Sequence, residues 1–241
     1  MAPDNLIAHR GWRHRYPENT LIAIEQAIAV GARHIETDIL MTKDQHLVLC
    51  HDEHLQRLCG IDRCVSQLSW EQLSQYSPCE PERLGEEFRG VSFSLLEDTL
   101  ALLAQHSDVQ LYVEVKEEAL GCFGHSLVAE KLLAQIAHHK EQCVVISFDP
   151  DILQMIKSRG FHRVGLVLTD WAQWPSPALT ALDPVVVFCD DDIIDDDRDL
   201  SDTPFALAVY EVDNMDRARQ LWARGVKYIE TFAIGEMLDA L

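Results

Sequence analysis

Short β-rich runs alternate with longer segments of helical periodicity along most of this 241-residue chain. Such alternation is typical of a parallel sheet whose strands are joined by helical crossovers. Nine segments have the character of strands: residues 5–9, 34–40, 47–51, 110–116, 143–147, 164–168, 185–189, 205–210 and 226–231. Nine strands in a chain of this length favour an eight-stranded (β/α)8 TIM barrel with one extra short strand, and an open doubly wound sheet is the alternative.

The helices expected between these strands carry apolar residues at intervals of three and four. The clearest is 20–30, which Asn19 or Thr20 would cap and Gly31 would close. Further helices are expected at residues 95–105, 126–139, 150–158 and 215–224. Residues 53–90 break the alternation, because they are polar and hold one short helical piece around 70–75. We interpret them as a small insertion after the second strand unit of a single domain covering residues 1–241.

The charge balance restricts the possible partners. The chain has 20 Lys and Arg against 40 Asp and Glu, a formal charge of −20, with 47% apolar residues. This composition is typical of a soluble globular protein, and its negative field argues against nucleic acid as a partner. No apolar run approaches the length of a membrane span, so stable membrane insertion is not expected. Seven scattered cysteines without a close pair suit a reducing compartment, and we expect a cytoplasmic protein whose oligomeric state the sequence leaves open.

Acidic side chains are concentrated at two of the expected strands. Glu36 and Asp38 are two residues apart, so both point to one face of the strand. Glu114 and Lys116 share a face of another strand in the same way. Three carboxylates that converge from two strands would form an all-oxygen site for a hard cation, Mg²⁺ or Ca²⁺. The alternative is a set of structural ion pairs with Lys116 and nearby arginines.

Histidines end two apolar runs, at His9 and His51. At the carboxyl end of a barrel strand, a histidine faces the mouth, where two of them can act as acid and base. Arg10 and Gly11 follow His9 directly. The glycine permits a tight turn, and the arginine offers planar contacts to phosphate. Taken singly, a histidine at a strand end is more often a packing or hydrogen-bonding residue than a catalytic one.

Taken in order, short motifs of the chain resemble those of the glycerophosphodiester phosphodiesterase family. The matching segments are 7–11 (Ile-Ala-His-Arg-Gly), 17–20 (Pro-Glu-Asn-Thr), Glu36-x-Asp38, His51-Asp52, Glu114-x-Lys116 and 147–150 (Ser-Phe-Asp-Pro). The resemblance implies a TIM barrel that hydrolyses a small-molecule glycerophosphodiester, such as glycerophosphocholine or glycerophosphoethanolamine, to glycerol 3-phosphate and an alcohol.

The resemblance also implies residue roles. Glu36, Asp38 and Glu114 would hold one divalent cation, Mg²⁺ or Ca²⁺. His9 and His51 would be the acid and the base, in an order that the sequence leaves open. Arg10 and Lys116 would bind phosphate oxygens, and Glu18 would fix the first loop. The nucleophile would be either water or the neighbouring glycerol hydroxyl, which would give a cyclic phosphate.

The C-terminal third departs from the family pattern. Residues 225–232 read Gly-Val-Lys-Tyr-Ile-Glu-Thr-Phe, where the family usually has Gly-Val-Asp-Gly-Ile-Ile-Thr-Asp. Glu211 or Glu230 would therefore bring negative charge near the barrel mouth, and Tyr210 would be a pocket wall or a core aromatic. Two other functions stay open: a phosphodiester-binding protein without turnover, and a related barrel phosphodiesterase that acts on lysophospholipids.

Overall fold

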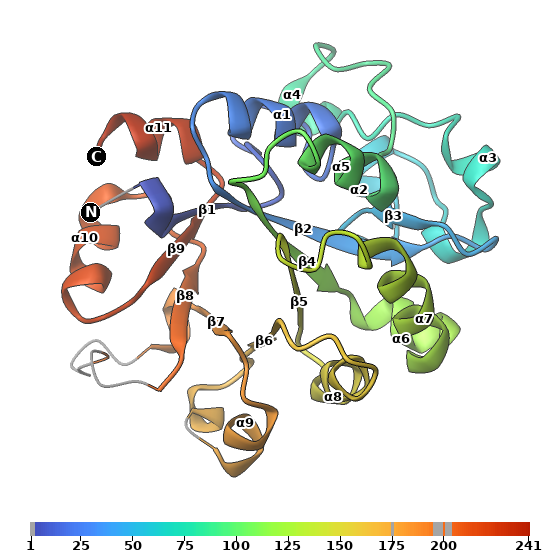
Figure 1. Cartoon of the computed structure of the whole chain (residues 1–241). Helices are drawn as coiled ribbons and strands as arrows, with labels where there is room; N and C mark the ends of the chain where they lie inside the picture. The colour runs from blue at the N-terminus through green and yellow to red at the C-terminus, as the bar shows by residue number, and fades with distance from the viewer. Residues whose placement is uncertain (1–2, 175, 195–199, 201–203) are drawn as a thin grey trace.

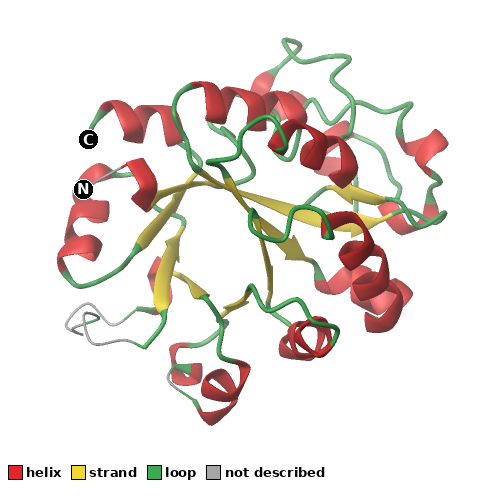
Figure 2. Cartoon of the chain, viewed as in Figure 1, coloured by secondary structure: helices red, strands yellow, loops and turns green. Residues whose placement is uncertain are grey.

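The computed structural model of the chain describes residues 3–174, 176–194, 200 and 204–241. Eight parallel strands form a closed barrel, because β1 pairs with both β2 and β9. Helices surround the strands on the outside (Figures 1 and 2). The TIM barrel expected from the sequence is confirmed. Its strands are β1 (Leu6–Ala8), β2 (His34–Met41), β4 (Gln110–Val115), β5 (Cys143–Ser147), β6 (Val164–Val167), β7 (Val186–Asp190), β8 (Ala206–Tyr210) and β9 (Tyr228–Thr231).

The ninth strand, β3 (Leu47–Leu49), is the extra one, and it runs antiparallel to β2. The hairpin brings the chain back along β2 until Cys50 N donates to the carbonyl of Asp38 at 3.1 Å. The sequence pattern suggested that His51 ends a barrel strand. This is wrong, because the strand before it, β3, is not part of the barrel. His51 returns to the level of Asp38 because β3 reverses the direction of the chain.

Five helices coincide with the expected ones to within a few residues. The start of α1 is capped by Thr20, whose Oγ1 accepts from Ala23 N at 3.3 Å. These helices are α1 (Leu21–Ala29), α5 (Leu96–Leu103), α7 (His125–Ile136), α8 (Pro150–Ser158) and α10 (Met215–Ala223). The sequence pattern missed α6 (Glu117–Phe123), α9 (Pro177–Leu182) and α11 (Ile234–Asp239). In the described ranges, no helix combines the length and apolar character needed to cross a bilayer.

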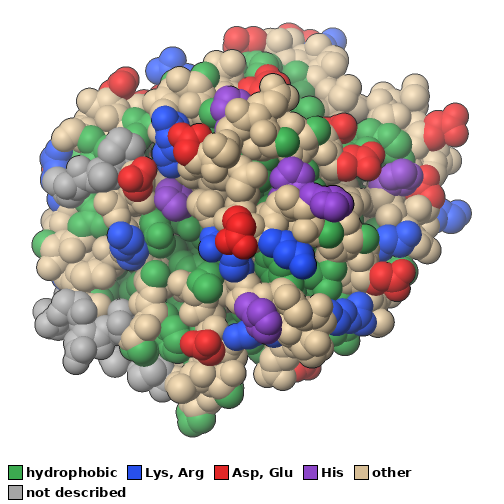
Figure 3. Space-filling view, viewed as in Figure 1, with side chains coloured by type: hydrophobic (Ala, Val, Ile, Leu, Met, Phe, Trp, Pro, Cys, Tyr) green, Lys and Arg blue, Asp and Glu red, His purple; other side chains and the backbone are tan. Residues whose placement is uncertain are grey.

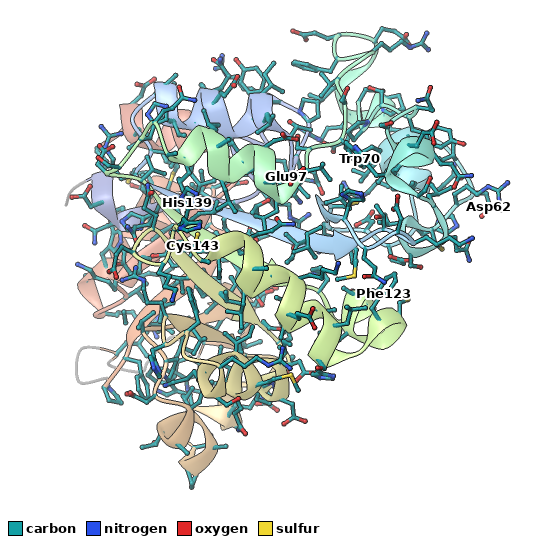
Figure 4. All side chains as sticks on the ribbon, turned by 45° about the vertical axis from the view of Figure 1, so that its right-hand side comes forward. Asp62, Trp70, Glu97, Phe123, His139 and Cys143 are labelled. Atoms are coloured by element: carbon teal, nitrogen blue, oxygen red, sulfur yellow. The ribbon has the colours of Figure 1, made fainter. Side chains whose placement is uncertain are left out.

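The segment 53–90 lies between β3 and α5 and contains no barrel strand. It is more helical than its sequence suggested, with α2 (Gln56–Cys59), α3 (Trp70–Leu73) and α4 (Pro81–Leu84). Capping explains α3, because Ser69 and Gln72 form a reciprocal capping box. Figure 4 places Asp62 at the outer edge of this segment and Trp70 nearer the barrel.

Two apolar layers hold the barrel. The larger fills the space between strands and helices, as in other barrels of this class. The smaller lies inside the barrel and includes Ile7, Tyr112, Ile146 and Phe188. Because these side chains fill the interior, the barrel is closed below its carboxyl end, and polar side chains at that end stand on an apolar floor.

The outer surface carries mixed charge on the side that Figure 3 shows. Lys and Arg side chains there are interspersed with acidic, histidine and apolar ones. Among the described residues on this face, basic side chains therefore form no continuous stripe of one sign.

Candidate active site

A cavity of about 150 Å³ opens at the carboxyl end of the barrel. Charged and imidazole side chains line one part of its wall, and apolar or aromatic side chains line the rest. The lining residues are His9, Arg10, Asp38, His51, Glu114, Lys116, Ile146, Phe148, Val167, Phe188, Tyr210, Glu211 and Glu230. Six of the seven site residues expected from the sequence are among them, and the seventh, Glu36, adjoins the cluster they form.

Strand register brings three carboxylates together. Asp38 on β2 pairs directly with Glu114 on β4, and Glu36 is two residues earlier on the same face of β2. Oxygen atoms of these three residues all lie within 4.8 Å of one another. Glu36 and Asp38 are each 1% exposed and Glu114 is 8% exposed. This separation and burial put three acids within reach of a single ion.

The electrostatics of the three carboxyls differ. Burial raises the pKa of Glu36 well above its usual value, and the charges of Asp38 and Glu230 add to the shift. Burial and the charge of Asp38 also raise the pKa of Glu114. Burial would raise the pKa of Asp38 too, but Arg10 and Lys116 outweigh it, so this pKa is lowered.

A divalent cation fits these residues. Glu36 Oε1 is buried and has no hydrogen-bond partner among the described residues. Clustered buried carboxylates lose solvation and repel each other, which a bound cation would offset. The donors are all carboxylate oxygens, the set that Mg²⁺ and Ca²⁺ prefer.

Two basic side chains border the acidic cluster. Arg10 Nη1 donates to Glu18 Oε1 at 3.0 Å, and Arg10 Nε lies 3.1 Å from Asp38 Oδ2. Lys116 Nζ is 2.9 Å from Glu114 Oε1 and 3.5 Å from Asp38 Oδ1. Burial would lower the pKa of Lys116, but Asp38 and Glu114 raise it above its usual value, so the lysine is charged.

The turn after β1 places Arg10 and the backbone close to the acids. Arg10 and Gly11 both have positive φ, at 56° and 78°, and Arg10 N donates to Glu36 Oε2 at 3.1 Å. A Cβ on Gly11 would lie 2.7 Å from the carbonyl carbon of Ala23 in α1. Only glycine allows this turn to pack so tightly against the helix.

The two histidines have different surroundings. His9 is 7% exposed, its Nε2 lies 3.7 Å from Glu36 Oε2, and its ring stacks on Phe232 with centroids 4.5 Å apart. Burial, followed by the charge of Arg10, lowers the pKa of His9 well below its usual value. His51 is more open to solvent, and its Nδ1 donates to Asp52 Oδ1 at 2.6 Å.

An arginine from the insertion links the parts of the site. Arg57 in α2 donates to Glu18 at 2.6 and 3.0 Å and to Asp52 at 2.7 and 3.1 Å. Glu18 also accepts from Arg10 and from Arg13. Burial would raise the pKa of Glu18, but these arginines, Arg57 first, lower it far below its usual value. Glu18 thus contacts the first loop as expected, whereas Arg57 was not foreseen.

The sequence offers Asn19 as one of two candidate helix caps, and the structure gives it a different place. Its Nδ2 donates to Asp38 Oδ2 at 2.8 Å, and its Oδ1 accepts from Thr37 Oγ1 at 2.7 Å. Thr20 caps the helix instead. The position of Asn19 between two charged motifs was the only sequence signal for this contact.

Glu230 on β9 lines the cavity and is 2% exposed. The β1–β9 register pairs it with Ile7, a residue of the barrel interior, so its side chain belongs to the inner wall. Its departure from the family pattern was the signal that pointed to it. Tyr210 lines the same cavity and also packs against the inner apolar layer, so both alternatives left by the sequence apply to it.

The fold and the cavity define a class: (β/α)8-barrel proteins with an acidic cluster, two histidines and two basic side chains at the barrel mouth. The signature of the glycerophosphoryl diester phosphodiesterase family matches residues 9–232 of the chain. The chain belongs to this family.

Curated relatives agree with this assignment, and a solved structure shares the fold. The chain is 35% identical over 161 residues to a glycerophosphodiester phosphodiesterase of Bacillus altitudinis, and 30% identical over 165 residues to one of Caldanaerobacter subterraneus. The matched segments span 66% and 67% of this chain, but only 62% and 65% of those relatives. In fold, the chain is similar to an Oleispira antarctica phosphodiesterase solved with its product sn-glycerol-3-phosphate, with a TM-score of 0.85 and 20% identity over 98% of this chain and 96% of that one.

Proposed function

We propose that this protein hydrolyses glycerophosphodiesters, such as glycerophosphocholine or glycerophosphoethanolamine, to glycerol 3-phosphate and an alcohol, using one divalent cation, Mg²⁺ or Ca²⁺. Its chief support is that acidic, basic and imidazole side chains meet in a single cavity at the barrel mouth. We propose further that residues 1–241 act as one catalytic domain, to which the insertion at 53–90 contributes Arg57.

The proposed substrate is an anion, so its non-bridging oxygens need positive charge. Arg10 and Lys116 would contact these oxygens. The Lys116 ammonium has three N–H donors and two carboxylate contacts, which leaves one N–H for a phosphate oxygen. Glu36, Asp38 and Glu114 would hold the cation. When bound, the cation would neutralise phosphate charge as the bond to the leaving oxygen breaks.

Proton transfer falls to the two histidines. The lowered pKa of His9 keeps its imidazole neutral. A general base must be neutral in this way to accept a proton from the attacking water or glycerol hydroxyl. Asp52 holds the Nδ1–H of His51, which leaves Nε2 of His51 for the departing alkoxide. In this assignment His9 is the base and His51 the acid.

The cavity size bears on the choice of substrate. About 150 Å³ accommodates a small polar diester better than an acyl chain, which needs a longer apolar groove. Ile146, Phe148, Val167, Phe188 and Tyr210 form the apolar and aromatic part of the wall, and all of them lie within this one small cavity. This favours deacylated glycerophosphodiesters over lysophospholipids.

The direct test is product formation. Protein loaded with Mg²⁺ or Ca²⁺ should release glycerol 3-phosphate from glycerophosphoethanolamine faster than from the matching lysophospholipid, and EDTA should stop it. His9→Ala and His51→Ala should each lower kcat by at least about 10²-fold. Metal-loaded protein that binds these diesters without turnover would instead support the binding-protein alternative.

A further inference from the structure

A second group of metal-ligating atoms adjoins the three carboxylates. One ring nitrogen of His9 and one oxygen each of Glu36 and Glu230 lie within 4.8 Å of one another. All three residues are buried, at 7%, 1% and 2% exposure. Glu36 belongs to both groups, so its carboxylate stands between them. Glu230 is absent from the proposed reaction, which gives no reason to bury a further acid beside Glu36.

Polar atoms of this second group lack partners. His9 Nδ1, Glu36 Oε1 and Glu230 Oε1 are each inaccessible to solvent and have no hydrogen-bond partner among the described residues. A buried polar atom without a partner costs about 1–3 kcal/mol of desolvation, more for a charged one. His9 Nδ1 lies on the side of the ring that faces Glu211, at 3.8 Å, whereas Nε2 faces Glu36 at 3.7 Å. The two unpartnered carboxylate oxygens, on adjoining buried side chains, therefore indicate a missing ligand that is positively charged.

The donor set distinguishes this ion from the first. Imidazole nitrogen and carboxylate oxygen are both donors that Zn²⁺ binds, and a zinc site with three protein ligands leaves a fourth position open. Mg²⁺ and Ca²⁺ prefer the all-oxygen group of Glu36, Asp38 and Glu114. A carboxylate can bridge two ions about 3.5–4 Å apart, as in two-metal sites.

We propose that His9, Glu36 and Glu230 form a second cation site, selective for Zn²⁺ or a similar d-block ion, next to the all-oxygen site and bridged to it by Glu36. An ion there occupies a nitrogen of His9 that proton transfer requires. On the proposed function, the second ion is therefore an inhibitor, and excess Zn²⁺ should lower the rate of the Mg²⁺- or Ca²⁺-loaded protein.

The test measures Zn²⁺ binding directly and does not depend on catalytic turnover. The protein is saturated with Ca²⁺ and titrated with Zn²⁺ against a chromogenic chelator, while released Ca²⁺ is followed with an indicator. We expect one Zn²⁺ to bind per chain without release of Ca²⁺. Glu230→Gln should weaken Zn²⁺ binding at least about tenfold and Ca²⁺ binding by a clearly smaller factor, because it removes a direct ligand of the Zn²⁺ site but only a neighbouring charge of the Ca²⁺ site.

Glu211→Gln is the matched control. Glu211 lines the same cavity and its Oε1 lies 3.8 Å from His9 Nδ1, but it is outside the ligand group, so its loss should change Zn²⁺ affinity by less than about threefold. Equal Zn²⁺ affinity in wild type and Glu230→Gln, or one-for-one release of Ca²⁺, would overturn the proposal. If Glu230→Gln is unstable, the fallback is NMR of the wild-type protein with Co²⁺ bound. A paramagnetically shifted imidazole N–H signal that disappears in His9→Gln would support the site. If the wild-type protein shows no such signal, the proposal is overturned.

Inhibition is read separately. Zn²⁺ should inhibit wild type at least about tenfold more strongly than Glu230→Gln. Protein that binds Zn²⁺ as expected but never turns over a diester would refute the proposed function and leave the cation site supported.

Discussion

Replacing Arg57 by methionine should weaken both the fold and the catalytic site. The guanidinium donates two hydrogen bonds to Glu18 and two to Asp52, at 2.6 to 3.1 Å. Glu18 in turn holds Arg10, and Asp52 holds His51. Methionine keeps most of the side-chain volume and removes these four bonds, together with a longer one from Arg57 to Glu80 at 3.5 Å, so the change removes the charge and its hydrogen bonds without opening a large cavity.

The contacts set the size of the effect. Breaking a buried ion pair costs about 3–5 kcal/mol, because it leaves a buried charge unpaired. The Arg57 side chain is 38% exposed, and Glu18 keeps contacts from Arg10 and Arg13, so this case falls below that range. We expect the free energy of unfolding to drop by about 2–3 kcal/mol. A loosened Asp52 would leave His51 without a fixed orientation, and kcat should fall by up to about 10²-fold.

Urea unfolding and turnover of glycerophosphoethanolamine measure the two effects. Arg89→Met is the control, because Arg89 pairs with Glu86 on the exposed surface and its loss should cost less than about 0.5 kcal/mol. A double-mutant cycle with Glu18→Gln should give a coupling of about 1–3 kcal/mol. If Arg57→Met matches the control in stability, the linkage reasoning is wrong; if stability falls but kcat holds, Arg57 does not orient His51.

Three further outcomes follow from single contacts. Asn19→Ala removes the amide that donates to Asp38 and should weaken Mg²⁺ or Ca²⁺ about 10- to 100-fold in calorimetry, whereas unchanged affinity would show that Asp38 needs no such support. Gly11→Ala brings a Cβ against Ala23 at positive φ and should cost at least about 2 kcal/mol of unfolding free energy in urea, so wild-type stability would contradict the tight turn. Burial lowers the pKa of His34 to about 4, so between pH 6.5 and 4 the unfolded chain binds a proton that the fold does not. Stability should therefore fall as pH drops through this window, by up to about 3 kcal/mol, and His34→Gln should flatten that part of the profile; an unchanged slope would assign the acid sensitivity elsewhere.

The strands were predictable because each is a compact β-rich run set off by polar or helical sequence. Seven of the nine strands fall within the expected segments, and β2 and β7 each extend one residue beyond theirs, to Met41 and Asp190. The missed helices have weak local signals. The helix Glu117–Phe123 begins directly after Lys116 at the end of a strand and buries only Ala119 and Leu120, too few apolar residues to show a period. The helix Ile234–Asp239 is six residues long, shorter than the pattern needs to repeat.

The site was predictable where residue type and spacing act within one segment. Glu36 and Asp38 share a strand face whatever the rest of the fold does. Contacts between distant segments were not predictable, because they depend on register and on the path of the insertion. Arg57 contacts Glu18 only because the insertion of residues 53–90 folds back over the first loop. Glu230 lies beside the acidic group only because the last strand pairs with the first.

That last pairing governs when the pocket comes into being. His9 N donates to the carbonyl of Thr231 at 2.9 Å, so the seam of the barrel joins segments made early and late in synthesis. A nascent chain on the ribosome would already carry Glu36, Asp38 and Glu114, yet its acidic half-pocket would face water with one side missing. Closing so long a loop is an unfavourable late event in folding. The complete pocket should therefore form in a single step, when β9 pairs with β1 and closes the barrel.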